Sequence, residues 1–204
     1  MAKTLKRAKF KTQRRLRTEL PGLGRPFAIK EPDGKRNSRR LSDFGVRLQE
    51  KQKICFHYGV QEKQLKNAIR RARKEKSANW VDTLMGQLES RLDNVVFRLG
   101  LARSMPAARQ LVRHGHVTVN GKVKSFPAFE CSINDKIEFS EQIQKSVNFE
   151  FSLKNPRLLD IPSYLSRSEA GGKITAEFIA KPHFEHVPFQ LEARFIAEKY
   201  GHVR

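Results

Sequence analysis

The segment from Arg91 to Lys124 places two short helical patterns directly before a hairpin signal, and this order constrains the fold more than any other part of the chain. Four apolar residues recur at helical spacing and predict one buried helical face, namely Leu92, Val95, Val96 and Leu99. Ser104 is a suitable N-cap for a second helix, which we expect to end near Gly115. Earlier in the chain, Ser42 is a suitable N-cap for a helix that we expect to run to about Tyr58. Asn120-Gly121 follows a short alternating stretch and is the strongest short-range signal of a β-hairpin.

The same segment is strongly basic. It holds seven Lys or Arg residues against a single acid, Asp93. Arg109 and Arg113 lie four residues apart, and like charges at that spacing oppose helix formation. A fold that tolerates such crowding usually has a polyanion to neutralise it, whereas a merely solvated face normally mixes both signs of charge.

The whole chain carries a formal net charge of +20, and residues 1–77 hold 24 Lys or Arg residues against 7 acids. This balance favours nucleic acid as the partner, with an anionic membrane and an acidic protein as alternatives. No apolar run is long enough to span a bilayer, and the single tryptophan, Trp80, lies in a stretch without basic residues. We therefore expect no membrane partner.

Several motifs resemble those of one known family. Arg91–Lys124 resembles the S4-type RNA-binding domain, a helix–helix–hairpin module. The stretch Leu41–Lys53 (LSDFGVRLQEKQK), the tripeptide Tyr58-Gly59-Val60 and the stretch Ile161–Leu165 (IPSYL) are similar to the bacterial-type small-subunit ribosomal protein S4 (uS4) family. The resemblance runs from about Arg39 to the end, with the motifs in the family's order and spacing.

The resemblance implies an α+β fold in which a helical domain contains an inserted α/β RNA-binding module of two helices and an antiparallel sheet. We expect a basic, largely irregular arm over residues 1–40, a helical domain over 41–90 and 188–204, and the module with its sheet extension over 91–187. Alternating apolar residues also predict strands over 135–139, 148–153 and 173–179. The same alternation predicts core positions for six phenylalanines, namely Phe126, Phe129, Phe149, Phe151, Phe178 and Phe184.

The resemblance also implies which residues contact RNA. On the helix–hairpin face these are Arg91, Arg98, Arg103, Arg109, Gln110, Arg113, His114, His116, Asn120 and Lys122. A second basic surface would come from Arg47, Lys51, Lys53, Arg70 and Arg71. Three residues of the arm, Arg36, Arg39 and Arg40, would lie near the path by which mRNA enters.

In function, the resemblance implies a structural protein that binds 16S rRNA at a multi-helix junction and nucleates assembly of the body of the 30S subunit. It further implies a contact with the fifth small-subunit protein and a contribution to translational accuracy. The basic N-terminus also has the composition of an organellar transit peptide, but we interpret it as an RNA-binding arm and expect a cytoplasmic ribosome.

The sequence contains no catalytic constellation, so we expect neither an enzyme nor a cofactor. Cys55 and Cys131 lie far apart, and His114 and His116 have no evident third ligand, so no metal site is predicted. Two alternatives stay open: a stand-alone chaperone of structured RNA, and an accessory of an RNA-modifying enzyme. The second would need a catalytic domain for which the remaining residues offer no nucleophile or nucleotide loop.

Overall fold

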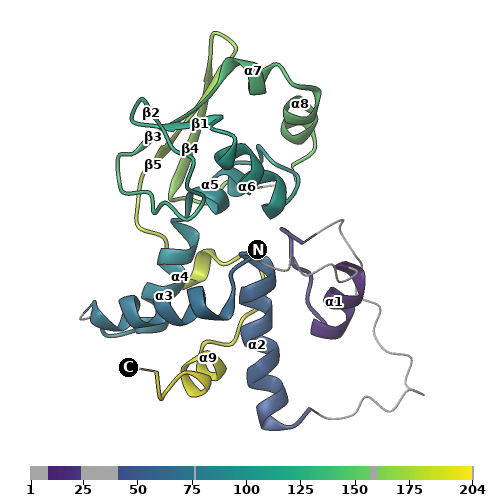
Figure 1. Ribbon diagram of the computed structural model, residues 1–204, viewed down its shortest axis with the longest axis vertical. Coiled ribbons are helices and arrows are strands. Elements are labelled where there is room, and N and C mark those ends of the chain that lie inside the picture. The colour runs from purple at the N-terminus through teal and green to yellow at the C-terminus, as the bar shows by residue number, and fades with distance from the viewer. Residues whose placement is uncertain (1–8, 24–40, 76, 157–159, 204) are drawn as a thin grey trace.

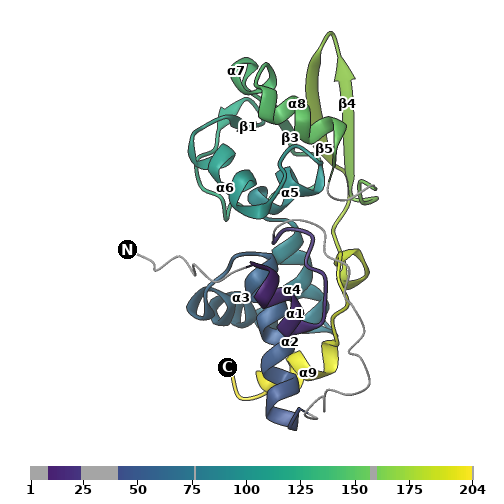
Figure 2. The ribbon, with the colours of Figure 1, turned by 90° about the vertical axis from the view of Figure 1, so that its right-hand side faces the viewer.

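The computed structural model describes residues 9–23, 41–75, 77–156 and 160–203, which form two lobes stacked along the long axis (Figures 1 and 2). The helical lobe comprises α1 (Lys9–Leu16), α2 (Asp43–His57), α3 (Glu62–Lys74), α4 (Trp80–Glu89) and α9 (Ala193–Lys199). The helices of the sheet lobe are α5 (Leu92–Arg98), α6 (Met105–Arg113), α7 (Glu141–Gln144) and α8 (Val147–Lys154). Its strands are β1 (Val117–Val119), β2 (Lys122–Val123), β3 (Lys136–Phe139), β4 (Leu165–Ala170) and β5 (Lys173–Phe178). A 3-10 turn, η1 (Phe184–His186), lies on the return to α9, and the whole confirms the predicted α+β class.

Polar side chains begin several helices where the sequence predicted. Ser42 accepts a hydrogen bond from the Gly45 N–H at 3.2 Å at the start of α2. Ser104 accepts one from the Ala107 N–H at 3.4 Å at the start of α6, which carries proline in its first turn. Each cap satisfies a backbone N–H that has no partner inside its helix, an effect worth about 0.5–2 kcal/mol.

The sheet is antiparallel throughout, with the strand order β2-β1-β3-β5-β4. Asn120 and Gly121 join β1 to β2 with φ of 50° and 74°, the backbone that a type I′ turn requires, so the predicted hairpin is confirmed. In β3, Ile137 and Phe139 are buried and alternate with exposed residues. The sheet therefore has one face against the core, as its alternating sequence predicted.

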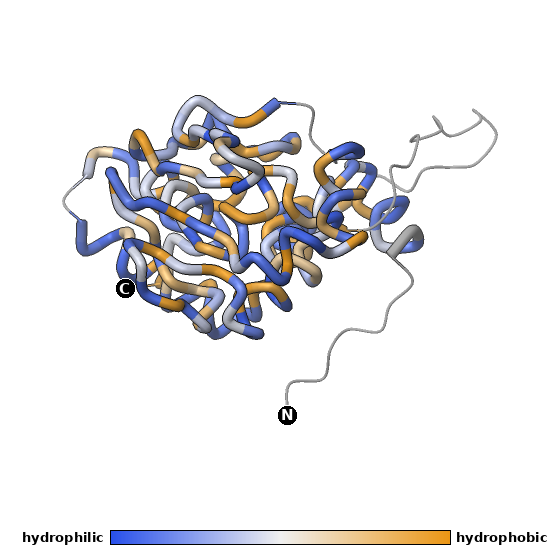
Figure 3. The backbone as a smooth tube through the Cα atoms, turned by 90° about the horizontal axis from the view of Figure 1, so that it is seen from above, coloured by the Kyte–Doolittle hydropathy of each residue, from blue (hydrophilic) through white to orange (hydrophobic). Residues whose placement is uncertain are grey.

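Each lobe has its own hydrophobic core. One cluster joins residues of α5, α6, the sheet and α8, and the other joins residues of α1–α4 with Ile196 of α9 and Tyr200. Figure 3 shows hydrophobic and hydrophilic residues alternating along the chain, as expected for helices that bury one face only. The final helix thus packs on the helical lobe, although the whole sheet lobe separates it from α4 in sequence.

The strand predicted over residues 148–153 is wrong, because this segment lies in helix α8. Ser146 caps the helix by accepting a hydrogen bond from the Phe149 N–H at 3.3 Å. Phe149 and Ser152 are buried, three residues apart as on one helical face, whereas Phe151 is 43% exposed. In a six-residue segment the apolar residues can fit both the two-residue period of a strand and the 3.6-residue period of a helix, and the Ser146 cap favours the helix.

Two of the six phenylalanines predicted as core residues are exposed. Phe151 lies beneath the Arg103 guanidinium, and Phe126, in the loop after β2, is 67% exposed. Within the predicted arm of residues 1–40, the structure describes residues 9–23, which include helix α1. Leu16 and Leu20 are each 1% exposed in the helical core, so this part of the arm is packed against the helical lobe.

Candidate RNA interface

A buried carboxylate organises the inner part of the helix–hairpin segment. Asp93 is fully buried near the start of α5, and its Oδ2 accepts hydrogen bonds from Arg91 Nη2 at 2.8 Å and Arg109 Nη2 at 2.7 Å. The Asp93 N–H donates to the Pro127 carbonyl at 3.1 Å, which anchors the loop after β2 to the same helix. The two arginines are therefore occupied by an internal anion, although the sequence predicted them as RNA contacts.

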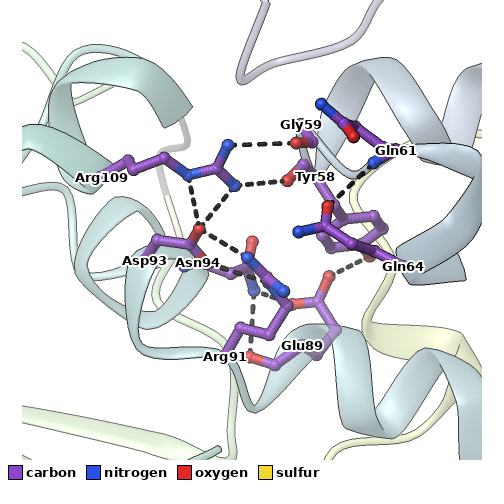
Figure 4. A network of polar contacts seen from close by, with 9 residues as sticks. All are labelled: Tyr58, Gly59, Gln61, Gln64, Glu89, Arg91, Asp93, Asn94 and Arg109. Carbon is purple, nitrogen blue, oxygen red and sulfur yellow. Dashed lines mark hydrogen bonds and ion pairs between the residues drawn. The ribbon is translucent and has the colours of Figure 1, made fainter. Parts of the chain in front are cut away.

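Arg109 also ties the two lobes together. From α6 in the sheet lobe it donates to the carbonyls of Tyr58 and Gly59, at 3.1 and 3.0 Å, where α2 of the helical lobe ends (Figure 4). A side chain on Gly59 would meet Arg109, since an ideal Cβ there lies 3.0 Å from Nη1, and Gly59 has a φ of +60°. Glycine is thus required both for the turn and for the close approach of the guanidinium.

Glu89, the last residue of α4, is the second buried anion and is also fully buried. Its carboxylate accepts hydrogen bonds from the hydroxyls of Tyr58 and Tyr164, at 2.5 and 2.6 Å, and from Asn94 Nδ2 at 2.9 Å. Arg98 Nε lies 3.4 Å from the same carboxylate, and Arg98 Nη2 donates to the His186 carbonyl at 2.7 Å. Arg98 is accordingly held inside the protein.

Both tyrosine hydroxyls stay protonated in this setting. Burial, together with the neighbouring negative charge of Glu89, raises the pKa of Tyr58 and of Tyr164 well above the usual value. Each hydroxyl can therefore donate to the carboxylate across the whole pH range in which the protein works. Since Tyr164 belongs to the predicted IPSYL motif, this contact explains why that loop docks on α4.

We expect Tyr164→Phe to lower the free energy of unfolding by about 1.5–3 kcal/mol, the range for a lost hydrogen bond to a buried charged group. Urea denaturation of the full chain would measure the change. Tyr200→Phe is the matched control, because its hydroxyl donates to Glu62 at 3.1 Å and that carboxylate is 43% exposed. Equal losses in the two variants would contradict the role of burial at Glu89.

The outer part of the segment is exposed. Arg103, Gln110, Arg113, His114 and Lys122 all lie at the surface of α6, its preceding loop and the β1–β2 hairpin. Among the described residues, neither Arg113 nor Lys122 lies within 4 Å of a carboxylate oxygen. These two cations are therefore available to an external anion, unlike Arg91, Arg98 and Arg109.

Asn120 and His116 hold the hairpin rather than extend from it. The Asn120 side chain donates to Asp135 at 2.7 Å and accepts from the Lys136 N–H at 2.9 Å. His116 Nδ1 lies 3.1 Å from the Ser140 hydroxyl. The structure therefore gives both residues a local structural role on the face where the sequence predicted RNA contacts.

The second predicted surface is mostly paired as well. Lys53 is buried against Glu50 at 2.6 Å, Lys51 contacts Glu62 at 2.7 Å, and Arg47 contacts Glu198 at 2.8 Å. On the exposed side of α3, Arg71 pairs with Glu130 of the sheet lobe at 2.7 Å, and Arg70 donates to Asn67. Arg36, Arg39 and Arg40 lie outside the described residues.

The two cysteines are free thiols held protonated by their surroundings. Burial raises the pKa of Cys55 to about 11 and that of Cys131 to about 12, so neither is an activated nucleophile at neutral pH. Within the described ranges, no three His, Cys, Asp or Glu side chains are grouped so that they could hold a metal ion. No helix in that part of the chain is long and apolar enough to cross a membrane.

Sequence reasoning missed the anions that hold the arginines. Asp93 was the single acid of the basic segment, and that isolation was the signal that could have identified it as an internal partner. Glu89 gave no such signal, because its partners Tyr58 and Tyr164 come from distant parts of the chain. Lys124 was also missed, and its ammonium lies 4.6 Å from the centre of the Phe129 ring.

Comparison with known proteins agrees with these features. The family model of the ribosomal protein S4/S9 N-terminal domain matches residues 2–89, and the model of the S4 domain matches residues 90–137. Small ribosomal subunit protein uS4B of Bdellovibrio bacteriovorus is 42% identical over 201 residues, which cover 96% of each chain. The uS4 protein of a Synechococcus strain is 38% identical over 197 residues, or 95% of this chain and 96% of that one.

A third relative, small ribosomal subunit protein uS4c of Cyanophora paradoxa, is 43% identical over 189 residues, or 90% of this chain and 92% of its own. The two family models meet between residues 89 and 90, where α4 ends and the sheet lobe begins. Since both models match and the relatives align over nearly the full length, the chain belongs to the uS4 family of ribosomal proteins and contains an S4 domain.

Proposed function

We propose that this chain is a structural protein of the small ribosomal subunit that binds 16S rRNA directly at a multi-helix junction. The uS4 family is structural, so the chain is not an enzyme. One observation carries the proposal: on the helix–hairpin face, Arg113 and Lys122 remain exposed and unpaired among the described residues, while Arg91 and Arg109 share Asp93. Such outward cations can bind RNA phosphates, and the inner pairs hold them in place.

The finer parts of the proposal rest on the resemblance to the uS4 family. We propose that the chain has two domains, with the module of residues 91–187 inserted in the helical one, and the presence of two separate hydrophobic cores supports this division. By binding rRNA early, the protein would nucleate the body of the 30S subunit and contribute to accuracy, in contact with the fifth small-subunit protein. Arg36, Arg39 and Arg40 would lie near the mRNA entry path. The Bdellovibrio and Synechococcus relatives are bacterial, which favours a cytoplasmic ribosome over an organellar one.

The test is binding of the full chain to 16S rRNA and to an unrelated folded RNA of equal length, over a salt series. We expect the double variant Arg113→Gln, Lys122→Gln to bind 16S rRNA more weakly. Each lost phosphate contact should also reduce the slope of log affinity against log salt by about 0.7–0.9. The matched control is Lys154→Gln, Arg194→Gln, which removes the same charge from α8 and α9, where both cations are paired with carboxylates.

Preference for 16S rRNA that persists at moderate salt, and is lost only in the Arg113, Lys122 variant, would support the proposal. Equal binding of both RNAs, with the same loss in both double variants, would mean that the chain is a general polyanion binder. The alternative of a stand-alone chaperone of structured RNA would then be preferred.

A further inference from the structure

We propose that Phe126 is a stacking platform for an unpaired base of the bound RNA. The inference rests on the proposed function and adds a residue whose chemistry is not electrostatic. Phe126 is 67% exposed, although a large aromatic side chain is normally placed where it can bury its surface. Aromatic rings that accept bases are a common feature of proteins that bind unpaired nucleotides.

Backbone hydrogen bonds fix the loop that carries Phe126. The Phe126 carbonyl accepts a hydrogen bond from the Phe129 N–H at 3.0 Å, and the next residue, Pro127, is buried. The carbonyls of Pro127 and Phe129 accept from the N–H groups of Asp93 and Leu92, at 3.1 and 2.8 Å, at the start of α5. Because the backbone is already fixed, stacking of a base on the ring costs little conformational entropy of the protein, and this small cost favours binding.

The sequence just before Phe126 is positively charged. Lys122 and Lys124 lie just before it in the chain, and the Lys124 ammonium covers the neighbouring Phe129 ring at 4.6 Å. Val123, 62% exposed, is three residues from Phe126, so their Cα atoms are at most about 11 Å apart. Of the two acids in the loop between β2 and β3, Glu130 is paired with Arg71 at 2.7 Å, and Asp135 accepts a hydrogen bond from Asn120 Nδ2 at 2.7 Å. Exposed apolar surface that follows in the sequence cations with no carboxylate partner among the described residues suits a nucleotide, which offers a base and a phosphate together.

Two other exposed phenylalanines lack this arrangement. Lys199 lies over the ring of Phe44 at 5.1 Å, and Arg103 lies over the ring of Phe151 at 4.4 Å. In the part of the chain that the structure describes, no cation or aromatic ring is stacked on Phe126. Phe44 is 66% exposed, almost the same as Phe126, and lies in the helical lobe, so it provides a matched control.

The test compares Phe126→Leu, Phe126→Trp and Phe44→Leu in the full chain, at fixed salt and over a salt series. Leucine keeps apolar bulk but has no aromatic face, so Phe126→Leu should weaken 16S rRNA binding about 5- to 150-fold, the range for one base stacked on an aromatic residue. Phe126→Trp should bind at least as tightly as the unchanged chain. The salt slope should stay constant, since no phosphate contact is removed. Because Phe126 is exposed, all variants should keep their thermal midpoints.

Two outcomes would overturn the inference without touching the proposed function. The first is normal binding by Phe126→Leu while the Arg113, Lys122 variant is impaired. The second is weak binding by both the leucine and tryptophan variants, which would indicate a shape-specific apolar contact with protein or sugar. A loss in Phe44→Leu equal to that in Phe126→Leu would also count against a specific platform. By contrast, equal binding of 16S rRNA and unrelated RNA by the unchanged chain would refute the proposed function itself.

Discussion

Replacing Asp93 with alanine is expected to lower the free energy of unfolding by about 3–5 kcal/mol, the cost of removing one partner from a buried ion pair. The carboxylate is fully buried and is shared by Arg91 and Arg109, whose side chains are 11% and 27% exposed. Without it, two partly buried guanidinium groups lose their counter-ion. Urea denaturation at neutral pH would measure the change.

The control for Asp93→Ala is Glu150→Ala, which breaks the ion pair with Lys154 on the surface of α8. We expect no measurable change in its unfolding midpoint, because both side chains are well exposed and solvent screens the pair. If Asp93→Ala unfolded at the same urea concentration as Glu150→Ala, the buried carboxylate would contribute no more to stability than the surface ion pair does.

Asp93→Ala also distinguishes the effect of lobe orientation on RNA binding from the effect of net charge. The variant is one unit more positive than the unchanged chain, whose net charge is +20, and charge alone would make it bind RNA more tightly. We expect the opposite, because Arg109 would no longer be held against Tyr58 and Gly59 and the two lobes would lose their fixed orientation. Tighter binding by the variant would show that lobe orientation is unimportant for RNA recognition.

A second large effect is expected from acid. His57 is fully buried between the rings of Tyr58 and Phe189, each with its centroid 4.7 Å away, and neither ring nitrogen has a hydrogen-bond partner among the described residues. Burial, reinforced by the nearby Arg98 guanidinium, lowers the pKa of His57 to about 3. In the unfolded chain the pKa returns to about 6.5, so between these values the unfolded state binds a proton that the folded state does not.

Acidification therefore removes stability through His57, and the loss begins as the pH falls below about 6.5 and continues towards 3. We expect His57 to contribute roughly 2 kcal/mol of destabilisation between pH 6.5 and 4.5. His57→Leu keeps the apolar packing but has no proton to bind, so its free energy of unfolding should fall less over that interval. Urea denaturation of both proteins at each pH would measure the difference, and parallel pH profiles would contradict the assignment.

Local signals predicted much of the fold. Ser42, Ser104 and Asn120-Gly121 act within a few residues of themselves, and each cap or turn formed where the sequence placed it. Helix α8 was mistaken for a strand, since apolar residues in a short segment fit both periods and only the Ser146 cap distinguishes them. Strand β4 was not predicted, because five of its six residues are exposed and show no alternation.

The candidate interface was less predictable than the fold, because composition identifies a basic face but not which cations are already paired. Arg98 reaches the His186 carbonyl, 88 residues away, and Arg109 reaches Gly59, 50 residues away. Such contacts depend on how the two lobes meet, which no local pattern encodes. Phe126 was assigned to the core for the same reason, since alternation predicts a buried face only where a second layer covers it.

The position of α9 bears on the order in which the chain folds during its synthesis. The sheet lobe is contiguous, so all of its strands and helices have been made once Phe178 has been added. The helical core also needs Ile196 and Tyr200, which are added after the whole sheet lobe. We expect the sheet lobe, although it starts later in the chain, to fold first, while α2, α3 and α4 keep an apolar face uncovered until α9 has been made.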